Sequence, residues 1–470
     1  MRLLIAGGGG FRVPLIYRAL VSGRFSGLVS ELVLHDVDPA RLDAVTAVLR
    51  SMPAGAGAHL PVHATSDLSA ALSGASMVFA AIRPGGTAGR VADEKVAQDL
   101  GLLGQETTGA GGISYALRTI PHMLHLARLM RECCPDAWLI NFTNPAGMVT
   151  EALLPVLGDR VIGICDSAGG LVQRAARAAG VPLPEGRLDG VGYYGLNHLG
   201  WVYRLESGGR DALPGLLADA GALQSFEEGR LFPQPFLATL GLLPNEYLYY
   251  YYQRDAARRA MRAMAQTRGE TIHSQQQELY PRLAAAGREA YRLWEEARLS
   301  REEGYLAEAR GEGERRNEED LAGGGYERVA LAAMQALAGS GGTQLILNTR
   351  NALPVPPAPG PTDVAPAPLQ PAIPGLPADA VVEVPCTVTQ TGAVALPQQA
   401  PSEPQLGLLR RVKEVERFVV LAAATGNRDA AVQAFARHPL VDSADLAAKL
   451  MAGYEQAFPA LGKMWEGGER

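Results

Sequence analysis

Reactive and polar side chains follow several apolar runs of this sequence, and they are the residues best suited to chemistry. Arg83 follows one run, and Asn141 and Asn144 surround the end of another. Cys165 and Asp166 follow a third. A cysteine is more often an inert buried side chain than a ligand, but a neighbouring acid at a strand end favours the ligand interpretation. Because ligands of parallel sheets bind outside the carboxyl ends of the strands, we expect these residues to face one crevice.

A histidine stands among apolar and glycine neighbours in the segment Asn197-His198-Leu199-Gly200-Trp201. Taken alone, His198 is equally compatible with a hydrogen-bonded core histidine and with a ligand. If His198 meets Cys165, thiolate and imidazole supply two protein ligands of an open metal site. Ligand softness alone then favours zinc or iron.

Two further segments are candidates for the same crevice. Residues 104–109 form a polar loop that holds Glu106 and is too rich in glycine for a helix interior. Residues 247–252 contain five tyrosines, most of which we expect to pack in the core or at a domain interface. One of them can act as a base if a metal or another cation lowers its pKa.

A glycine run follows the first apolar segment, as in dinucleotide-binding folds. Residues 2–6 lead into Gly7, Gly8, Gly9 and Gly10, and an apolar helical pattern begins at Val13. Glycines there let the backbone approach a pyrophosphate at the positive end of the helix. The place of the third motif glycine is taken by Arg12 or Val13, so the run alone is also compatible with a flexible turn.

An acid at the end of the second predicted strand strengthens the nucleotide interpretation. Asp36 lies 27 residues after Gly9, near the offset expected for a carboxylate that binds the ribose hydroxyls of the adenosine. Such an acid repels a 2′-phosphate, so NAD is favoured over NADP. Asp38 competes for the same role.

Short apolar runs alternate with amphipathic, helix-length segments from residue 2 to about residue 184, which predicts a parallel sheet covered by helices. Six strands are expected, at residues 2–6, 31–36, 59–63, 76–82, 137–142 and 160–164. They fit a Rossmann-like, doubly wound dinucleotide-binding sheet in an α/β fold. We assign residues 1–190 to this NAD-binding domain.

The remaining sequence predicts a mixed α+β, largely helical second domain at residues 191–470. Strand patterns occur at residues 187–205 and 381–388, and helical character dominates from about residue 215 to 338. Residues 351–371 hold eight prolines and predict an extended surface loop. Two helices close the chain, one ending near Gly426 and one at residues 443–458. We expect this domain to bind substrate and metal and to mediate oligomerisation.

Composition excludes several classes of protein. The 43 basic and 49 acidic residues are not arranged in blocks, so we expect no nucleic-acid partner and favour a small neutral or anionic substrate. No apolar stretch is long enough for a membrane span, so we expect no membrane partner and a cytoplasmic location. The four cysteines show no CxxC pair, so disulfides are not implied.

Taken together and in order, these motifs resemble glycoside hydrolase family 4, particularly its 6-phospho-β-glucosidase members. The matching stretches cover nearly the whole chain: Gly7-Gly8-Gly9 with Pro14, Arg83-Pro84-Gly85-Gly86 with Arg90, residues 104–109, Asn141-Phe142-Thr143-Asn144-Pro145, Gly163-Ile164-Cys165-Asp166, Asn197-His198-Leu199-Gly200-Trp201, residues 244–252, Thr267-Arg268-Gly269-Glu270, residues 373–386 and His438-Pro439-Leu440-Val441. The resemblance implies a lactate/malate dehydrogenase-like NAD domain and a homodimer or homotetramer.

The resemblance also implies an unusual glycosidase mechanism that does not use two carboxylates. NAD takes a hydride from sugar C3, the ketone acidifies the C2 proton, and a base removes that proton. The aglycone leaves C1 by elimination, water adds, and the cofactor returns the hydride. Cys165 and His198 match the metal ligands, and the implied metal is Mn²⁺, which we prefer to the softer metals because the oxygens of the substrate complete its coordination. Tyr247 matches the C2 base.

Further residue roles follow from the same resemblance. Asp166 resembles the general acid of the 6-phospho-α-glucosidases, whereas many 6-phospho-β-glucosidases carry Asn there. Arg90 and Arg268 resemble clamps for the sugar phosphate or for another part of the substrate. The implied substrate-binding residues are Arg90, Asn144, Asp166 and Arg268, and the implied cofactor-binding residues are Gly7, Gly8, Gly9, Phe11, Arg12, Asp36, Arg83, Glu106 and Asn144.

The sequence departs from the family pattern in two places. Gly10-Phe11-Arg12-Val13-Pro14 replaces a run rich in hydroxyl groups and adds a cation near the cofactor or substrate, and the proline-rich stretch resembles an insertion.

The sequence is also compatible with a 6-phospho-α-glucosidase or α-galactosidase of the same family. Outside the family, the alternatives are a 2-hydroxy-acid dehydrogenase of the lactate/malate type and an NAD-binding sensor without catalysis.

Overall fold

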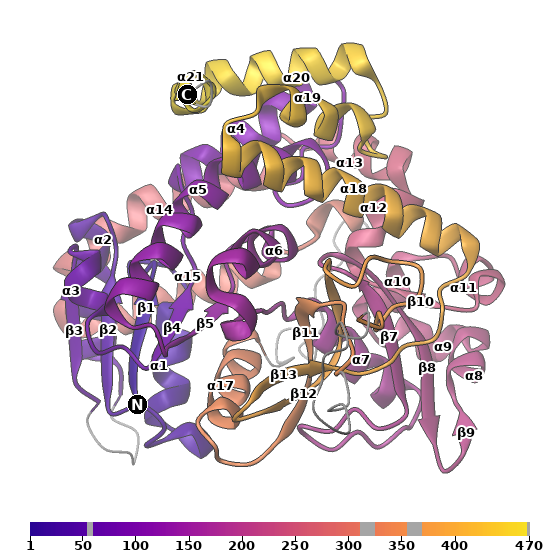
Figure 1. The fold of residues 1–470 in the computed structure, drawn as a ribbon, viewed down its shortest axis with the longest axis horizontal. Coiled ribbons are helices and arrows are strands. Elements are labelled where there is room, and N and C mark those ends of the chain that lie inside the picture. The colour runs from indigo at the N-terminus through magenta and orange to yellow at the C-terminus, as the bar shows by residue number, and fades with distance from the viewer. Residues whose placement is uncertain (54–59, 311–324, 355–368, 468–470) are drawn as a thin grey trace, which may run out of the picture.

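The structure is a computed structural model that describes residues 1–53, 60–310, 325–354 and 369–467. Its centre is one 13-stranded sheet with helices on both faces (Figure 1). Six parallel strands form its N-terminal part in the order β3-β2-β1-β4-β5-β6, the strand order of dinucleotide-binding folds. These strands are β1 (Arg2–Ala6), β2 (Glu31–His35), β3 (Val62–Thr65), β4 (Met77–Ala80), β5 (Trp138–Asn141) and β6 (Val161–Gly163).

The predicted Rossmann-like sheet is therefore confirmed, with small shifts in its strands. β3 begins three residues later than expected because it pairs with β2 from the register Leu32↔Val62 onwards. Residue 59, where that strand was expected to begin, lies outside the described residues.

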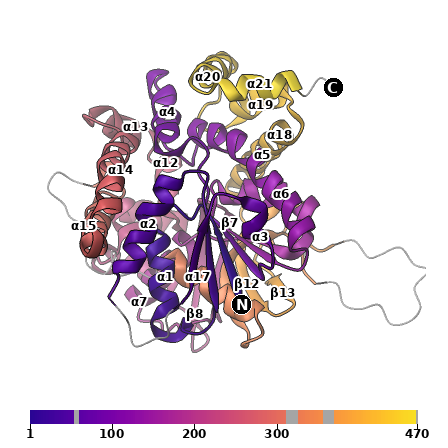
Figure 2. The same ribbon diagram turned by 90° about the vertical axis from the view of Figure 1, so that its left-hand side faces the viewer.

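Alternate residues of the strands enter two separate cores, as pleated strands require. Leu3 and Ile5 pack with α1 (Val13–Val21) and α2 (Pro39–Ser51). Leu4 faces the opposite side, which is covered by α5 (Ala110–Cys133) and α6 (Ala146–Leu157). Figure 2 shows α1 and α2 on one side of the strands and α6 on the other.

Antiparallel strands from the second half of the chain extend the same sheet. β11 pairs with β6 through Asn348 and Gly163, and the order continues as β11-β12-β7-β8-β10. The predicted boundary at residue 190 falls between α7 (Ser167–Ala178) and β7, and the sheet continues across it. The added elements are β7 (Val191–Leu196), β8 (Leu199–Ser207), β10 (Leu243–Pro244), β11 (Thr343–Arg350) and β12 (Val381–Thr389), with β9 (Arg210–Asp211) and β13 (Gly392–Ala395) beside β8 and β12.

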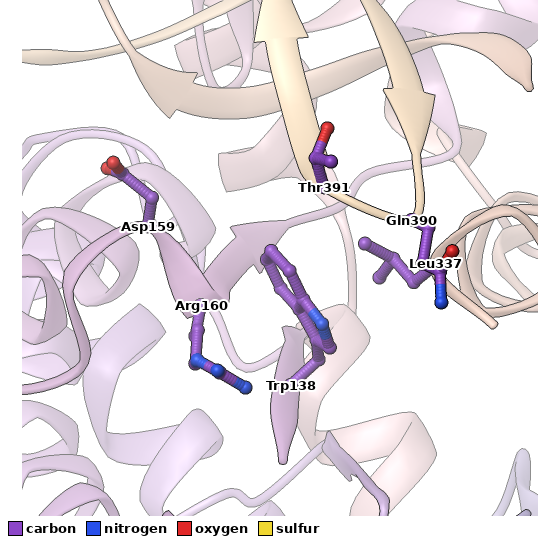
Figure 3. Close-up of a pocket in the computed structure, with 6 residues that line it drawn as sticks. All are labelled: Trp138, Asp159, Arg160, Leu337, Gln390 and Thr391. Carbon is purple, nitrogen blue, oxygen red and sulfur yellow. The ribbon is translucent and has the colours of Figure 1, made fainter. Parts of the chain in front are cut away.

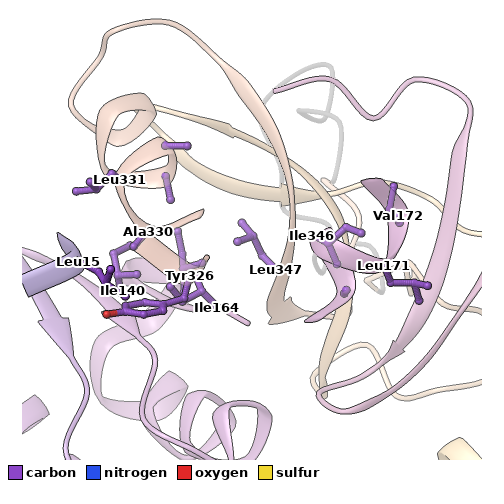
Figure 4. Close-up of a cluster of buried hydrophobic side chains, with 14 of the residues drawn as sticks. Leu15, Ile140, Ile164, Leu171, Val172, Tyr326, Ala330, Leu331, Ile346 and Leu347 are labelled. Atoms are coloured by element: carbon purple, nitrogen blue, oxygen red, sulfur yellow. The ribbon is translucent and has the colours of Figure 1, made fainter. Parts of the chain in front are cut away.

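Side chains from both halves of the chain share one hydrophobic core. Ile140 and Ile164 lie near Tyr326 and Leu331 of α17 (Tyr326–Leu337), and Leu347 of β11 lies close by (Figure 4). Burial of apolar side chains contributes roughly 25 cal/mol per Å². The second half of the chain is thus held against the nucleotide-binding sheet by the same packing that stabilises each half.

Helices of the second half cover both flanks of the sheet. α14 (Arg268–Ala285) packs on α2 and on α4 (Gly86–Asp99), and α15 (Ala290–Glu303) packs on α2. α18 (Glu403–Thr425) lies on α5, and the yellow helices of Figure 1 follow it. Four helices close the described part of the chain: α18, α19 (Arg428–Arg437), α20 (Ala444–Ala457) and α21 (Pro459–Gly467).

The two predicted closing helices correspond to α18 and α20, and α19 and α21 were not expected. α18 ends at Thr425, where Gly426 adopts the left-handed conformation (φ 71°) that terminates many helices. Residues 355–368 of the predicted proline-rich loop lie outside the described residues. At its base, buried Asn351 donates to the carbonyls of Ile373 and Leu376. Across the described ranges, no helix is long and apolar enough to span a bilayer.

Candidate active site

The glycine run forms a tight loop between β1 and α1. The amides of Gly7 and Gly8 donate to the carbonyl of His35 at 2.9 and 2.7 Å. A Cβ on Gly7, whose φ is 92°, would lie 2.5 Å from the carbonyl oxygen of Ala81. A Cβ on Gly8 would lie 2.7 Å from the Cβ of Leu34. Glycine is therefore required at both positions for steric reasons.

Asp36, and not Asp38, lies against this loop. Asp36 Oδ2 accepts from the amide of Gly9 at 3.0 Å, while Asp38 caps α2 by accepting from the amide of Ala40 at 3.0 Å. Val37 lies between the two acids and is 86% exposed. An exposed apolar side chain beside Asp36 offers a surface that suits the apolar face of an adenine. The loop, the acid and Val37 together fit an adenine dinucleotide.

Cys165 and His198 meet in the structure. Cys165 follows β6, and His198 occupies the turn between β7 and β8 with a left-handed φ of 63°. The distance from Cys165 Sγ to His198 Nε2 is 3.5 Å, and both residues are buried. Typical zinc bonds to nitrogen and sulfur, of about 2.1 and 2.3 Å, together exceed this distance, so both atoms can bind one ion.

Of this pair, the imidazole already has the protonation state of a metal ligand, whereas the thiol must lose its proton to bind a metal. Burial lowers the pKa of His198 to about 3, so the imidazole is neutral at physiological pH and has a lone pair to donate. Burial, followed by the negative charges of Glu383 and Asp166, raises the pKa of the Cys165 thiol well above its usual range. A bound cation opposes that rise. Among the described residues no group of three or more His, Cys, Asp and Glu side chains could hold a metal.

Tyr247 lies flat against His198. Their ring centroids are 3.8 Å apart and the planes differ by 9°. The amide of Tyr247 donates to Asn245 Oδ1 at 3.0 Å, which fixes the start of this short 3-10 turn. Of the neighbouring tyrosines, Tyr250 is buried, and Tyr252 accepts from Trp201 Nε1 at 3.1 Å, in agreement with the predicted structural roles.

A chain of hydroxyl and carboxyl groups leads away from Tyr247. The Tyr305 hydroxyl lies 3.3 Å from the Tyr247 hydroxyl and 3.4 Å from Glu246 Oε1. Ser167 Oγ donates to the same Glu246 oxygen at 2.5 Å. Burial and the charge of Glu228 raise the pKa of Glu246 to about 8. Tyr305 was not predicted from the sequence, because its contact with Tyr247 depends on the packing of the segment after α15. No role was predicted for Glu246, although it directly precedes Tyr247.

Glu106 and two arginines form a buried ionic cluster beside these groups. Glu106 binds Arg83 through Oε2 and Arg90 through Oε1, the latter at 2.8 Å. Arg90 Nε also donates to Glu94 Oε1 at 2.8 Å. Burial alone would raise the pKa of Glu106, but Arg83 and Arg90 overcome it and lower that pKa to about 2. Glu106 is therefore an anion, and Arg90 is held by two carboxylates.

Arg12 and Asp166 face each other across the mouth of the nucleotide loop. Arg12 Nη1 lies 4.0 Å from Asp166 Oδ2, and both side chains are partly exposed. Tyr326 supports this pair by donating to the Arg12 carbonyl at 2.7 Å and stacking on Phe142, with ring centroids 4.2 Å apart. No role was predicted from the sequence for the segment at Tyr326. The preceding glycines 323 and 324 lie outside the described residues.

Arg268 and Arg301 complete the set of cations. Arg268 follows the capping box of Thr267 and donates to the carbonyls of Gly304 and Arg301, the latter at 3.2 Å. The guanidinium of Arg301 lies 4.9 Å from the ring of Phe11. The sequence did not predict Arg301, because nothing distinguishes it from the other arginines of its helix. One cavity is lined by Arg90, Glu106, Tyr247, Arg268 and Tyr305, with other residues.

Asn144 and His198 are positioned by a buried polar network. The carboxylate of Glu383 accepts from Tyr193 at 2.7 Å and from Asn197 at 3.4 Å. Asn197 in turn accepts from the amide of Ala146 at 3.1 Å, next to the cis peptide bond between Asn144 and Pro145. Burial raises the pKa of Glu383 to about 7. The Asn144 Oδ1 atom is buried and has no partner within the described ranges.

A second cavity, of about 440 Å³, lies at the other end of the parallel strands (Figure 3). Trp138, the first residue of β5, lines it together with Asp159 and Arg160. Asp159 accepts from Arg350 at 3.2 Å, and Arg160 donates to the Asp136 carbonyl. Its charges are thus paired, and we do not assign it to the candidate active site.

Comparisons with known proteins agree with this geometry. The model of "Family 4 glycosyl hydrolase" matches residues 2–181, and that of the "Family 4 glycosyl hydrolase C-terminal domain" matches residues 193–441. A "probable 6-phospho-beta-glucosidase" of Bacillus subtilis is 28% identical over 466 residues, which cover 96% of this chain and 95% of that protein. "6-phospho-alpha-glucosidase 1" of Lacticaseibacillus paracasei is 33% identical over 268 residues, which cover 53% of this chain and 59% of that protein.

A solved structure of similar fold is the 6-phospho-β-glucosidase of Thermotoga maritima with manganese, NAD⁺ and glucose 6-phosphate. Its TM-score is 0.77 at 25% identity, and the match covers 98% of this chain and 99% of that one. The similarity extends over both halves of the sheet and over the helices that flank them.

Proposed function

This chain belongs to family 4 of the glycosyl hydrolases, and from that premise we propose that it hydrolyses 6-phosphoglycosides, in particular 6-phospho-β-glucosides. We propose NAD and a divalent metal, Mn²⁺, as its cofactors. The Thermotoga maritima relative, which was solved with manganese, NAD⁺ and glucose 6-phosphate, supports both the cofactors and the substrate class. The full-length match to the Bacillus subtilis protein supports the β configuration.

The observation that carries this proposal is the meeting of Cys165, His198 and Tyr247. A thiol and a neutral imidazole 3.5 Å apart offer two ligands to one cation, and the ring of a tyrosine lies against that imidazole. A 2-hydroxy-acid dehydrogenase requires neither a metal pair nor a tyrosine in this place. The family match likewise supports the hydrolase over the dehydrogenase alternative.

The residues around the nucleotide loop fit NAD. Gly7, Gly8 and Gly9 leave the backbone open to a diphosphate, and Asp36 lies where it can accept from ribose hydroxyls. Bound there, NAD supplies a hydride acceptor that oxidises the sugar at C3 and later returns the hydride. Asn144, whose Oδ1 has no partner in the described structure, offers an acceptor beside the cofactor and sugar.

Cys165 and His198 would hold the metal, and the metal supplies Lewis-acid stabilisation of negative charge on the C2 and C3 oxygens. In this arrangement the Tyr247 hydroxyl is the base that takes the C2 proton. Burial, and then the charge of Glu246, raises the pKa of Tyr247 well above its usual range, so this role depends on a cation nearby. Arg268 lines the same cavity, and Arg90 and Arg268 are our proposed contacts for the 6-phosphate.

A second candidate function, 6-phospho-α-glucosidase, is favoured by one residue. Asp166 lies beside Cys165, and its carboxyl group faces Arg12 across the mouth of the site. A protonated Asp166 can give its proton to a leaving glycosidic oxygen, which is the role of a general acid. The Lacticaseibacillus paracasei relative, named as an α-glucosidase, supports this alternative.

Hydrolysis assays with matched substrates test the proposal. The 4-nitrophenyl 6-phospho-β-glucoside should release nitrophenol with NAD⁺ and Mn²⁺ present, and removal of either cofactor should stop the release. The α-anomer distinguishes the second candidate, and the unphosphorylated β-glucoside tests the need for phosphate. No release from any of the three substrates with both cofactors present would contradict the proposal and favour the sensor alternative.

We also propose that the protein acts in the cytoplasm as a homodimer or homotetramer. NAD and phosphorylated sugars are charged molecules that cells retain inside, which supports this location. Light scattering after size-exclusion chromatography measures the assembly, and a monomeric mass at working concentration would contradict it.

A further inference from the structure

We propose that Arg301 binds the phosphoryl group of the substrate and thereby selects phosphorylated sugars. This inference rests on the proposed function and adds a residue that the sequence motifs did not identify. Arg301 lies in the last turn of α15, opposite the nucleotide loop.

The side chain of Arg301 carries a buried donor without an acceptor. Its Nη1 atom is enclosed by protein and has no hydrogen-bond partner within the part of the chain that the structure describes. A guanidinium has five N–H donors and no acceptor, so an enclosed, unpaired nitrogen is costly unless a ligand accepts from it. The ring of Phe11 lies 4.9 Å from the guanidinium and holds it in place.

The charges around Arg301 are mainly positive. Burial, and then the cations Arg12, Arg90 and Arg268, lower the pKa of Arg301 well below its ordinary value, and Glu106 opposes this effect. Glu106 is already bound by Arg83 and Arg90. The cluster therefore favours an additional anion next to Arg301. A phosphate monoester supplies a charge of about −1.5 to −2 at neutral pH and three acceptor oxygens.

The predicted clamp Arg90 is less available for this task. Its Nε donates to Glu94 and its Nη1 to Glu106, both at 2.8 Å. Arg268 lines the cavity that holds Tyr247, and it donates to the carbonyl of Arg301 at 3.2 Å. This contact places the backbone of Arg301 beside the substrate cavity. Arginine suits this role because its planar fork binds phosphate oxygens in pairs.

The diphosphate of NAD offers similar chemistry, because Phe11 belongs to the nucleotide loop. We favour the substrate because Arg301 adjoins Arg90 and Arg268, which we propose to contact the substrate. Binding measurements with separate ligands distinguish the two sources.

A matched control lies on the same helix. Arg298 is three residues before Arg301 and is bound by Glu295 at 2.7 Å and Glu302 at 2.6 Å, within the helix itself. The substitutions Arg301→Met and Arg298→Met each remove one guanidinium group from the same helix. The guanidinium of Arg301 faces the other cations, whereas that of Arg298 is paired with carboxylates. Arg301→Gln keeps a donor and serves if the Met variant is unstable.

The experiment is calorimetric titration of the protein containing NAD⁺ and Mn²⁺ with glucose 6-phosphate, inorganic phosphate and glucose. A separate titration with NAD⁺, in protein freed of the cofactor, measures the NAD⁺ affinity. We expect Arg301→Met to weaken binding of both phosphate ligands by about 10- to 100-fold, the range expected for a lost charge-assisted contact. Glucose and NAD⁺ affinities should remain unchanged, and Arg298→Met should match the wild type for every ligand.

Two results would overturn the inference. Unchanged glucose 6-phosphate affinity in a folded Arg301 variant would show that the side chain is structural. Weaker NAD⁺ binding with intact glucose 6-phosphate binding would assign Arg301 to the cofactor diphosphate. If the proposed function itself is wrong, the wild-type protein will not cleave the glycoside substrates. That result is distinct from a change in ligand binding by the Arg301 variants.

Discussion

The imidazole of His198 lies parallel to the ring of Tyr247, with 3.8 Å between the centroids and 9° between the planes. The same imidazole lies 3.5 Å from Cys165 Sγ through its Nε2 atom. The side chain of His198 therefore contacts both the other proposed metal ligand, Cys165, and the proposed base, Tyr247. An ion held by Cys165 and His198 would bring positive charge near the Tyr247 ring, and such charge would favour the phenolate.

Removal of the Tyr247 hydroxyl should abolish most activity without altering the fold. Tyr247→Phe keeps the ring that stacks on His198 and removes the base, so we expect kcat to fall by about 10²- to 10⁴-fold. NAD⁺ affinity and the unfolding midpoint should stay at wild-type values. Steady-state kinetics and thermal unfolding measure these quantities, and a kcat within a few-fold of wild type would assign the base elsewhere.

Replacement of the proposed metal ligand should separate metal binding from cofactor binding. Cys165→Ser should lose tight Mn²⁺ binding and activity while NAD⁺ binding remains, because the thiol lies apart from the glycine loop. Cys133→Ser, at the end of α5, removes a thiol outside the site and should behave as wild type. Titration calorimetry with Mn²⁺ and with NAD⁺ distinguishes these outcomes. Joint loss of both ligands in Cys165→Ser would indicate a structural cysteine.

Asp36 should determine the preference for NAD over NADP. Asp36→Asn keeps an acceptor for the Gly9 amide but removes the charge that repels a 2′-phosphate. We expect the ratio of NAD⁺ to NADP⁺ affinity to fall by roughly 10-fold, about 1.4 kcal/mol. Asp38→Asn is the control, because Asp38 caps α2 and should leave the ratio unchanged. An unaltered ratio in the Asp36 variant would exclude the assigned role.

Buried His438 should make the protein less stable in acid. Its Nδ1 accepts from the Leu440 amide at 3.1 Å, and burial, with a smaller effect of Arg411, lowers its pKa to about 3. The unfolded chain, with a His pKa near 6.5, binds this proton more readily, so stability falls as pH decreases from about 6.5 towards 3. The slope is about 1.4 kcal/mol per pH unit for this one group.

Urea unfolding at about pH 7 and about pH 5 measures this loss. His438→Asn keeps an acceptor for the Leu440 amide and removes the titrating ring, so its unfolding free energy should decrease less between the two pH values. An equal decrease in both proteins would show that His438 does not contribute to the acid sensitivity.

Local patterns were sufficient to predict the nucleotide-binding half of the fold. The glycine run, the acid at residue 36 and the alternation of strands with helices each depend on neighbours in the sequence, and the structure has all three. The antiparallel extension was less predictable. β11 and β12 come from the end of the chain and lie between β6 and β7, and no local pattern encodes that order.

In the candidate site, too, some residues could be predicted from the sequence and others could not. Cys165 and His198 were ambiguous as single residues, and the family resemblance, not their spacing, indicated that they act together. Glu383, Tyr305 and Arg301 were missed because their contacts join segments far apart in sequence, such as the 190 residues between Tyr193 and Glu383. Such residues are identified by the burial of their side chains and by the geometry of their hydrogen bonds. A single sequence contains neither kind of information.

Reaction in D₂O tests whether the C2 proton is removed during hydrolysis. The enzyme, with NAD⁺ and Mn²⁺, is allowed to hydrolyse 4-nitrophenyl 6-phospho-β-glucoside, and the glucose 6-phosphate formed is examined by NMR for deuterium at C2. We expect solvent deuterium at C2 and no net accumulation of NADH, because Tyr247 removes the C2 proton and the hydride is returned. Product that retains only the original C2 hydrogen would contradict it and indicate direct displacement at C1.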